Sequence, residues 1–248
     1  MPSICYTPEP RNKHELRGER PRRILQVVTG TDHYLERPGL RTGLWLGELS
    51  HSWDVFMNAG FEQVIASPSG GAVPLEPKSI RFPNFDASTR AWYHDKEKMA
   101  LLDDVASLES VPAADFDAIF LTGGHAVMYD FPGCDALQRL IREIYEAGGA
   151  VGSVCHGYCG LLEAKLSDDS LLIAGKKLTG FSWVEEVLAG VAEIVPYNVE
   201  QSVKERGASY SKARVPFVPH TEVDGRLVTG QNPASARSAA RKLVERIK

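Results

Sequence analysis

The chain has 248 residues, of which 43% are hydrophobic, so it can bury a substantial core in one large domain or two small ones. Its 28 basic and 32 acidic residues are interspersed and give a net charge of -4, which excludes a basic stripe suited to a nucleic-acid backbone. The sequence has no apolar run of the roughly 18 residues that a membrane span needs, and it begins without the apolar segment of a signal peptide. We therefore expect a cytoplasmic protein that binds neither nucleic acid nor membrane.

The four cysteines indicate thiols rather than disulfides or a metal centre. Cys5, Cys134, Cys155 and Cys159 lack the paired spacing of metal sites. Cys155 and Cys159 are four positions apart, as one helical turn would place them. We expect reactive or buried thiols in a cytoplasmic chain.

Residues 1–21 differ from the rest of the chain. They are rich in Pro, Arg and Glu without periodicity, which predicts an extended N-terminal arm. Residues 22–248 show no internal repeat and no shift in composition, and they are predicted to form one α/β domain.

The beginning of this domain predicts a strand, a helix and a second strand. Runs rich in β-branched and apolar residues begin at Arg23 and at Phe61 and predict parallel strands. Residues 47–60 between them predict a helix that ends at Gly60. The apolar face of this helix would carry Leu49, Trp53, Phe56 and Met57.

Residues 72–114 are less regular than the segments around them. They predict a long loop followed by a helix over residues 96–107. Long excursions of this kind often line a site, so we expect this segment to shape a pocket.

The second half of the domain repeats the alternation of strands and helices. Apolar runs from Phe116 and Ala150 predict buried strands, and residues 135–147 between them predict a helix that ends at Gly148. The alternation predicts a doubly wound, mostly parallel sheet with helices on both faces, as in flavodoxin-like folds. Further predicted elements are a hairpin around Gly175, a helix ending at Gly207, a hairpin turn at Asp224 and Gly225, and a terminal helix capped by Asn232.

The most informative string is AGGAVGSVCHGYCGLLEA, in which an apolar strand ends on Cys155. The small residues Gly152, Gly157 and Gly160 would let the backbone turn sharply and push the thiol outward. Backbone N–H groups and the next helix would then lower the pKa of the thiol and stabilise an oxyanion. The string predicts a cysteine nucleophile, although spacing alone also fits a small buried residue at a strand end.

Several separated motifs occur in an order that is similar to a known family. The strings FLTGGHAVMYDFPG, GSVCHG, LTGFSWVEE and DGRLVTGQNPASA resemble the class I glutamine amidotransferase-like superfamily, and within it the ThiJ/PfpI (DJ-one/PfpI) family. The resemblance runs from about Arg22 to the C-terminus. It looks strongest toward the branch that contains glyoxalase III and a heat-shock chaperone.

The resemblance implies a set of catalytic residues. Cys155 would be the nucleophile and His156 its acid/base partner. Glu48 would reach the thiol as a protonated or hydrogen-bonding carboxyl group, since a carboxyl near an anionic sulfur is pushed toward protonation; a carboxylate at a helix N-terminus is the alternative. The acid that fixes the histidine tautomer would be Glu186, with Glu185 as the neighbouring alternative.

Further positions are candidates for the pocket around the nucleophile. The resemblance implies an oxyanion hole made by backbone N–H groups at Gly124 and His156. Candidate pocket residues are His125, His51 and Tyr158, a bulky aromatic where the branch commonly has proline or a small residue.

Five other side chains are left open by the sequence. Cys159 is either a resolving thiol or a buried spectator. The other four are aromatic and are either walls of the site or anchors of the core: Trp45, Trp92, Tyr93 and Trp183.

The resemblance implies a glutathione-independent, glyoxalase III-like enzyme. It would convert a small α-oxoaldehyde such as methylglyoxal into a hydroxy acid through a Cys155 hemithioacetal, with no cofactor or metal because the redox change is internal to the substrate. Alternatives are a stress chaperone or holdase, a cysteine redox sensor, a hydrolase or hydratase for another small substrate, and a relative without activity. Members of the superfamily commonly form homodimers, and we expect one here.

Overall fold

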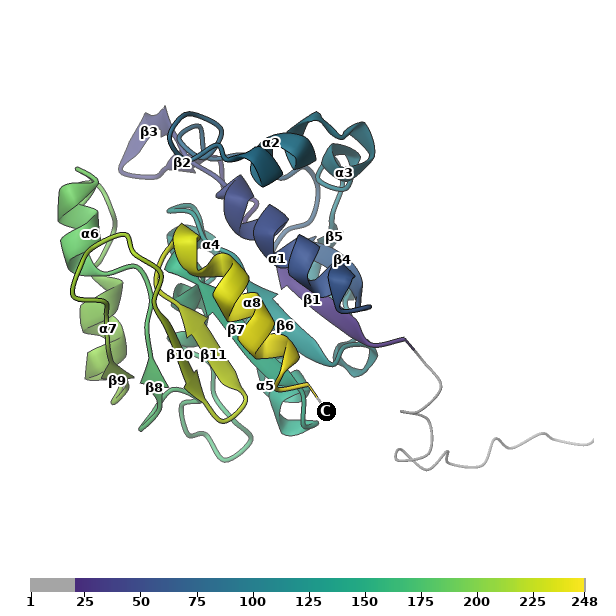
Figure 1. The fold of residues 1–248 in the computed structure, drawn as a ribbon. Coiled ribbons are helices and arrows are strands. Elements are labelled where there is room, and N and C mark those ends of the chain that lie inside the picture. Colours follow the sequence, from purple (N-terminus) through teal and green to yellow (C-terminus); the bar gives the residue numbers. More distant parts are fainter. Residues whose placement is uncertain (1–20, 248) are drawn as a thin grey trace, which may run out of the picture.

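One central sheet organises the computed structural model, which describes residues 21–247 (Figure 1). All neighbouring strands in this sheet are parallel except β10 and β11 at one edge, which are antiparallel. The predicted mostly parallel α/β sheet is therefore confirmed. Its order from edge to edge is β10 (Thr221–Asp224), β11 (Leu227–Gly230), β7 (Ala150–Val154), β6 (Ala118–Leu121), β1 (Arg23–Val27), β4 (Glu62–Ser67) and β5 (Ala106–Ser107).

The central strands are buried on both faces, because successive side chains enter two different cores. In β1, Leu25 belongs to the core under α5 (Asp135–Glu146), whereas Ile24 belongs to the core under α8 (Ala236–Val244). Strand β6 alternates in the same way. Two covered faces explain why both strands appear in the sequence as continuous apolar runs.

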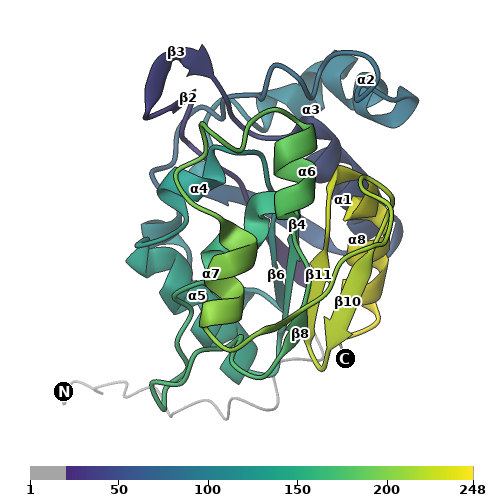
Figure 2. The ribbon, with the colours of Figure 1, turned by 90° about the vertical axis from the view of Figure 1, so that its left-hand side faces the viewer.

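Helices cover the two faces and the ends of the sheet (Figure 1 and Figure 2). On the face of α8 lies α1 (Leu46–Asn58), and α5 covers the opposite face. None of the helices in the described part of the chain is long and apolar enough to cross a membrane. The remaining α-helices are α2 (Ala87–His94), α3 (Lys96–Ala100), α4 (Val127–Asp130), α6 (Trp183–Leu188) and α7 (Val199–Glu205).

Short elements complete the fold. Strand β2 (His33–Tyr34) pairs with β3 (Arg37–Arg41) in a small antiparallel ribbon that the sequence did not predict. The 3-10 helices are η1 (Leu108–Ser110), η2 (Ala113–Asp115), η3 (Cys155–Leu161) and η4 (Pro233–Ser235).

Most predicted elements are confirmed. Helices α1, α5 and α7 end within two residues of the predicted glycines, and the turn at Asp224 and Gly225 joins β10 to β11. Asn232 caps η4, which leads directly into α8. The predicted arm over residues 1–21 lies outside the described residues, apart from residue 21.

Three predictions in the first half of the chain are wrong. The segment 96–107 is not one helix: α3 ends at Ala100, and Val105 and Gly71 exchange backbone hydrogen bonds that draw the chain into the extended strand β5. Helix α2, which Asp86 caps, lies where a loop was predicted. Met57 is half exposed because its neighbour Phe56 already occupies the core-facing side of α1.

The predicted hairpin around Gly175 is also wrong. Strand β8 (Lys177–Leu178) pairs in parallel with β9 (Ser209–Tyr210), far along the chain. Gly175 donates its N–H to Gly207 O instead of closing a hairpin. The parallel partner satisfies the backbone groups that a hairpin would have paired locally.

Candidate active site

A sharp turn holds Cys155 at the carboxyl end of β7. Its backbone is in the left-handed region, with φ of 54°, which is strained for a residue other than glycine. The 3-10 helix η3 starts at this residue. The sharp turn predicted at Cys155, called the elbow below, is therefore present and leads into a 3-10 helix. Gly157 permits the turn, because a Cβ atom there would lie 2.2 Å from Leu121 O.

His156 lies directly between the thiol and a carboxylate. Its Nδ1 is 3.3 Å from Cys155 Sγ, and its Nε2 is 2.6 Å from Glu186 Oε1. Burial lowers the pKa of His156, so the imidazole is neutral at neutral pH. A neutral ring that donates Nε2–H to Glu186 presents the lone pair of Nδ1 to the thiol, which is the arrangement of a general base.

Glu186 holds two histidines at once. Its Oε2 is 3.1 Å from His125 Nε2, while Oε1 binds His156. Burial opposes ionisation of this carboxyl, yet the two histidines together lower the pKa of Glu186 to about 2. The group is therefore a carboxylate at neutral pH and fixes the orientation of both rings.

Glu185 occupies a separate, structural position. Its Oε2 accepts hydrogen bonds from the backbone and hydroxyl of Ser182 and completes the N-terminal cap of α6. Its Oε1 accepts from Phe217 N at 2.7 Å and Asn232 Nδ2 at 2.9 Å. Of the two adjacent acids, Glu186 alone has a hydrogen bond to His156 among the described residues.

Glu48 reaches the nucleophile from α1. Its side chain is fully buried, and Oε2 accepts the N–H of Gly123 at 2.6 Å. Burial raises the pKa of Glu48 to about 8, even though hydrogen bonds from Gly123 and Cys155 favour the ionised form. Glu48 is therefore protonated at neutral pH and can offer a proton beside the sulfur.

The thiol itself differs from the sequence expectation. The elbow predicted a lowered pKa, but burial, followed by the effect of Glu48, raises the pKa of Cys155, and the backbone N–H of His156 opposes this only in part. Because two neighbouring acids resist ionising together, a proton is retained between Glu48 and Cys155. The thiol therefore keeps its proton at neutral pH, and His156 Nδ1 is the neighbouring group placed to accept it.

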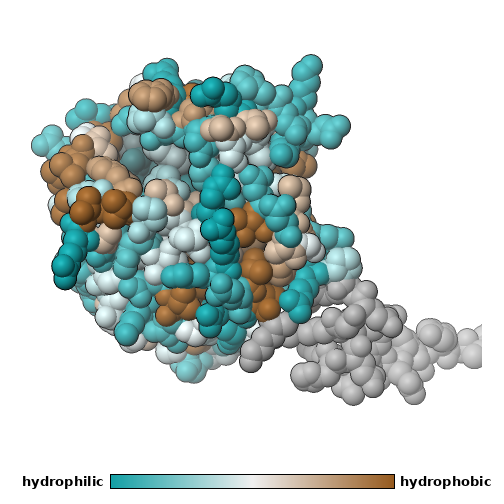
Figure 3. All heavy atoms as spheres, viewed as in Figure 1, coloured by the Kyte–Doolittle hydropathy of each residue, from teal (hydrophilic) through white to brown (hydrophobic). Residues whose placement is uncertain are grey.

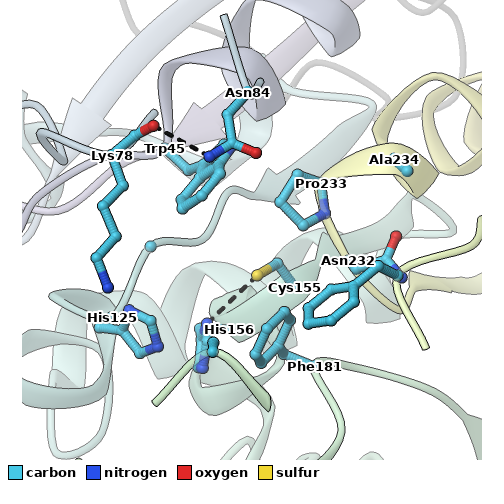
Figure 4. Close-up of a pocket in the computed structure, with 13 residues that line it drawn as sticks. Trp45, Lys78, Asn84, His125, Cys155, His156, Phe181, Asn232, Pro233 and Ala234 are labelled. Atoms are coloured by element: carbon cyan, nitrogen blue, oxygen red, sulfur yellow. Dashed lines mark hydrogen bonds between the residues drawn. The ribbon is translucent and has the colours of Figure 1, made fainter. Parts of the chain in front are cut away.

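A cavity of about 340 Å³ opens above the thiol (Figure 4). His125, Cys155, His156 and the backbone of Gly124 line it, as expected. The segment 72–114 contributes Lys78 and Asn84, which the sequence indicated only as part of an irregular excursion. The other lining residues are Trp45, Phe181, Ala189, Phe217, Asn232, Pro233 and Ala234.

Two predicted pocket residues lie elsewhere. Tyr158 is fully buried beneath the site, and its hydroxyl donates to Phe181 O at 2.7 Å. His51 follows Glu48 by one turn of α1, but its Nε2 lies 2.8 Å from Asp86 Oδ2 at the start of α2. The prediction for His51 rested on its distance from Glu48 along α1, and that for Tyr158 on its difference from related sequences. Neither residue lines the cavity.

The remaining thiol and aromatic candidates are mostly parts of the core. Cys159 is fully buried in the core on the α5 side, whereas Cys155 belongs to the core on the α8 side, and both are free thiols. Trp92 is buried against Trp53 with ring centroids 6.3 Å apart. Among the four aromatic candidates, Trp45 alone lines the described cavity.

His125, His156 and Glu186 also have the composition of a metal site. Their possible ligand atoms all lie within 4.8 Å of one another. Both histidines, however, direct Nε2 at the carboxylate, so a metal ion would have to displace two existing hydrogen bonds. The group is arranged as an acid that orients two bases.

The chain is similar to curated proteins over nearly its whole length. It is 33% identical to "Glutathione-independent glyoxalase HSP31" of Saccharomyces cerevisiae, with 92% of this chain and 99% of that protein covered. It is 30% identical to "Glyoxalase 3" of Candida albicans, with coverages of 90% and 97%.

The chain is also similar to solved structures over nearly its whole length. The crystal structure of glyoxalase III from Candida albicans matches with a TM-score of 0.85 and 28% identity, covering 92% of this chain and 98% of that one. The Rapid Encystment Protein of 24 kDa from Francisella tularensis matches with a TM-score of 0.87 and 31% identity, covering 92% and 99%. The family model of the DJ-1/PfpI family matches residues 43–246. The chain therefore belongs to the DJ-1/PfpI family.

Proposed function

We propose that this protein is a glutathione-independent glyoxalase that converts a small α-oxoaldehyde such as methylglyoxal into the corresponding hydroxy acid. The observation that carries the proposal is the line of contacts from Cys155 Sγ through His156 to Glu186, at the base of a cavity. Relatives named as glutathione-independent glyoxalases support the same reaction. Thiol, base and orienting acid are the parts that covalent catalysis on an aldehyde needs.

The first step forms a bond between sulfur and carbon. As Cys155 Sγ adds to the aldehyde carbon, His156 Nδ1 takes the thiol proton, and the aldehyde oxygen gains a proton to complete a hemithioacetal. The protonated carboxyl of Glu48 lies beside the sulfur and is the proposed source of that proton. Glu186 stays ionised and stabilises the imidazolium that forms.

The oxygen of the attacked aldehyde needs stabilisation while it carries negative charge. We assign this role to the backbone N–H groups of Gly124 and His156, two residues that line the cavity together with Cys155. Gly124 N–H has no hydrogen-bond partner among residues 21–247, so it is available to a ligand. Backbone donors of this kind need no reorganisation during reaction.

The later steps move hydrogen within the substrate. A base removes the hydrogen of the hemithioacetal carbon, the electron pair forms an enediol with the neighbouring carbonyl, and a proton returns to that neighbouring carbon. The product is a thioester of the hydroxy acid, and water cleaves it to release the acid and the thiol. One carbon is oxidised and its neighbour is reduced, so atoms and electrons balance without an external oxidant.

The test is lactate formation from methylglyoxal by purified protein, with neither glutathione nor metal added. We expect the Cys155→Ala variant to form none. Cys134→Ala is the matched control, because Cys134 is a free, half-buried thiol outside the cavity. A wild-type protein without activity, or a Cys155→Ala variant that keeps it, would contradict the proposal.

A second candidate function rests on a different surface. Three side chains of α6 are exposed although apolar, Val184, Val187 and Leu188, and Val215 is exposed on the segment between β9 and β10. Apolar residues gather on the molecular surface at the left of Figure 3, where Figure 1 places α6. Such a patch suits a holdase that binds unfolded chains. Suppression of aggregation of a heated test protein should then survive Cys155→Ala and fail in Leu188→Ser.

A redox-sensor role has less support, because burial raises the pKa of Cys155 and oxidation by peroxide requires a thiolate.

We propose, further, that residues 22–248 act as one domain and that the protein is a cytoplasmic homodimer, on the family resemblance. Sedimentation equilibrium tests the dimer, and a monomer mass at micromolar concentration would contradict it.

A further inference from the structure

One exposed cation lines the cavity and is not used by the proposed mechanism above. Lys78 lines the cavity opposite the nucleophile, and Figure 4 shows its side chain pointing down toward His125. The Lys78 side chain makes no ion pair with any side chain in the described part of the chain. Its ammonium group is therefore available to a bound molecule.

His125 gives this ammonium a fixed neighbour. The imidazole stacks obliquely beside His156, with ring centroids 4.3 Å apart, and its Nε2 is 3.1 Å from Glu186 Oε2. Because an ionised carboxylate only accepts, Nε2 carries the hydrogen, and in the neutral ring Nδ1 is an acceptor. Among the described residues Nδ1 has no hydrogen-bond partner, so this acceptor and the Lys78 ammonium are both left for a ligand.

An α-oxoaldehyde presents two oxygens on adjacent carbons. Once Cys155 binds the aldehyde carbon, the first oxygen lies near the backbone N–H groups at the elbow. The second oxygen must become an enediol hydroxyl, and it bears negative charge on the way. A charged donor across a small cavity from the thiol is suited to that oxygen.

We propose that Lys78 and His125 bind the second oxygen of the substrate and make the enzyme specific for 1,2-dicarbonyl compounds. The Lys78 ammonium gives a proton to the carbonyl oxygen as the electron pair of the broken C–H bond forms the enediol. When the enediol collapses to the thioester, the hydroxyl on the sulfur-bearing carbon returns a proton to the Lys78 amine. His125 Nδ1 accepts from the ammonium before this transfer and from the new hydroxyl after it. This inference rests on the glyoxalase function proposed above.

The experiment compares Lys78→Met with Lys78→Arg, and uses Lys96→Met as a control because Lys96 is an exposed lysine on α3 that does not line the cavity. For methylglyoxal, kcat/KM should fall about 100-fold in Lys78→Met, since removal of one charged oxyanion donor has effects of this size. It should fall less, by about tenfold, in Lys78→Arg, because a guanidinium keeps the charge near the oxygen but does not release a proton. His125→Gln, which keeps an amide donor for Glu186, should lower kcat/KM by about tenfold or more.

Two readouts separate substrate recognition from a structural effect. Alkylation of Cys155 by iodoacetamide should proceed at the wild-type rate in Lys78→Met, because the thiol and its base are intact. Protection of the thiol by propanal, which lacks the second oxygen, should also be unchanged, whereas protection by methylglyoxal should weaken. Unchanged kcat/KM in Lys78→Met, or equal weakening for both aldehydes, would overturn this proposal alone. A wild-type protein that forms no lactate would overturn the glyoxalase function as well.

Discussion

The Oε1 atom of Glu186 lies 2.6 Å from Nε2 of His156, and this contact determines which nitrogen of the ring faces the thiol. The carboxylate accepts from Nε2–H, so Nδ1 carries the lone pair and lies 3.3 Å from Cys155 Sγ. A donor in place of the carboxylate would reverse the tautomer. The relationship therefore connects one charge on α6 to the reactivity of a thiol on another element.

We expect Glu186→Gln to lower kcat by about 10²- to 10⁴-fold, because an amide group can hold the wrong tautomer of the histidine. The measurement is steady-state lactate formation from methylglyoxal. The folded structure should persist, since the substitution keeps the shape of the side chain. A Glu186→Gln variant with kcat within about threefold of wild type would show that the tautomer is set in another way.

The adjacent acid provides the matched control. Glu185 caps α6 and anchors Phe217 N and Asn232 Nδ2. We expect Glu185→Gln to cost roughly 1–3 kcal/mol in the free energy of unfolding, the range for a buried hydrogen-bonding group that loses its partner. Its kcat should change far less than that of Glu186→Gln. Urea unfolding and kinetics on the two variants should give opposite rankings, and equal effects in both assays would contradict the division of roles.

Glu48 should make stability depend on pH in a defined direction. Its pKa rises from 4.5 to about 8 on folding, so between these pH values the folded state holds a proton that the unfolded state has released. Raising the pH through this window therefore lowers the free energy of unfolding, with a limiting slope of about 1.4 kcal/mol per pH unit. Glu48→Gln removes this contribution.

The quantity to measure is the difference in unfolding free energy between wild type and Glu48→Gln from pH 5 to pH 8. Asp130 and His156 also have shifted pKa values, but both groups are present in each protein and largely cancel in the difference. We expect the advantage of wild type to decline steadily with rising pH. A difference that is independent of pH would mean that Glu48 is ionised in the folded protein.

The sequence predicted the sharp turn at Cys155 because the residues that shape the backbone there are local. Cys155 follows an apolar strand and precedes Gly157, and the close approach of that glycine to β6 leaves no room for a side chain. Adjacent acids are a different case, since Glu185 and Glu186 have the same chemistry and diverge only through the neighbours that folding brings to each. The sequence therefore left both open until the contacts were known.

The misplaced pocket residues show what local patterns omit. His51 and Tyr158 are near Glu48 and Cys155 in the chain, yet one binds the cap of α2 and the other lies beneath the elbow. Lys78 was missed for the opposite reason. It comes from an irregular segment whose position depends on tertiary contacts, such as the hydrogen bond from Leu44 N to Pro74 O.

Tyr158 should matter for stability and little for catalysis. Its buried hydroxyl donates to Phe181 O, so Tyr158→Phe leaves a buried carbonyl without that donor. We expect a loss of about 1–2 kcal/mol in the free energy of unfolding, with kcat within about twofold of wild type. Tyr93→Phe is the control, because the half-buried Tyr93 lies away from the cavity. A large loss of kcat in Tyr158→Phe with unchanged stability would contradict this assignment and show that Tyr158 contributes to the pocket.

Gly124 should tolerate no side chain, for two reasons that can be separated. Its φ is 110°, and a Cβ atom would lie 2.1 Å from Gly43 O, a backbone atom that cannot rotate away. Gly133 also has a positive φ, 70°, but a Cβ atom there meets nothing within 4 Å. Gly133→Ala should therefore cost roughly 1–2 kcal/mol from backbone strain alone, and Gly124→Ala should cost more because of the added clash. Urea unfolding measures both costs. Equal costs would show that the loop before α4 can move away from Gly43, in which case the position of the Gly124 N–H is not fixed by packing.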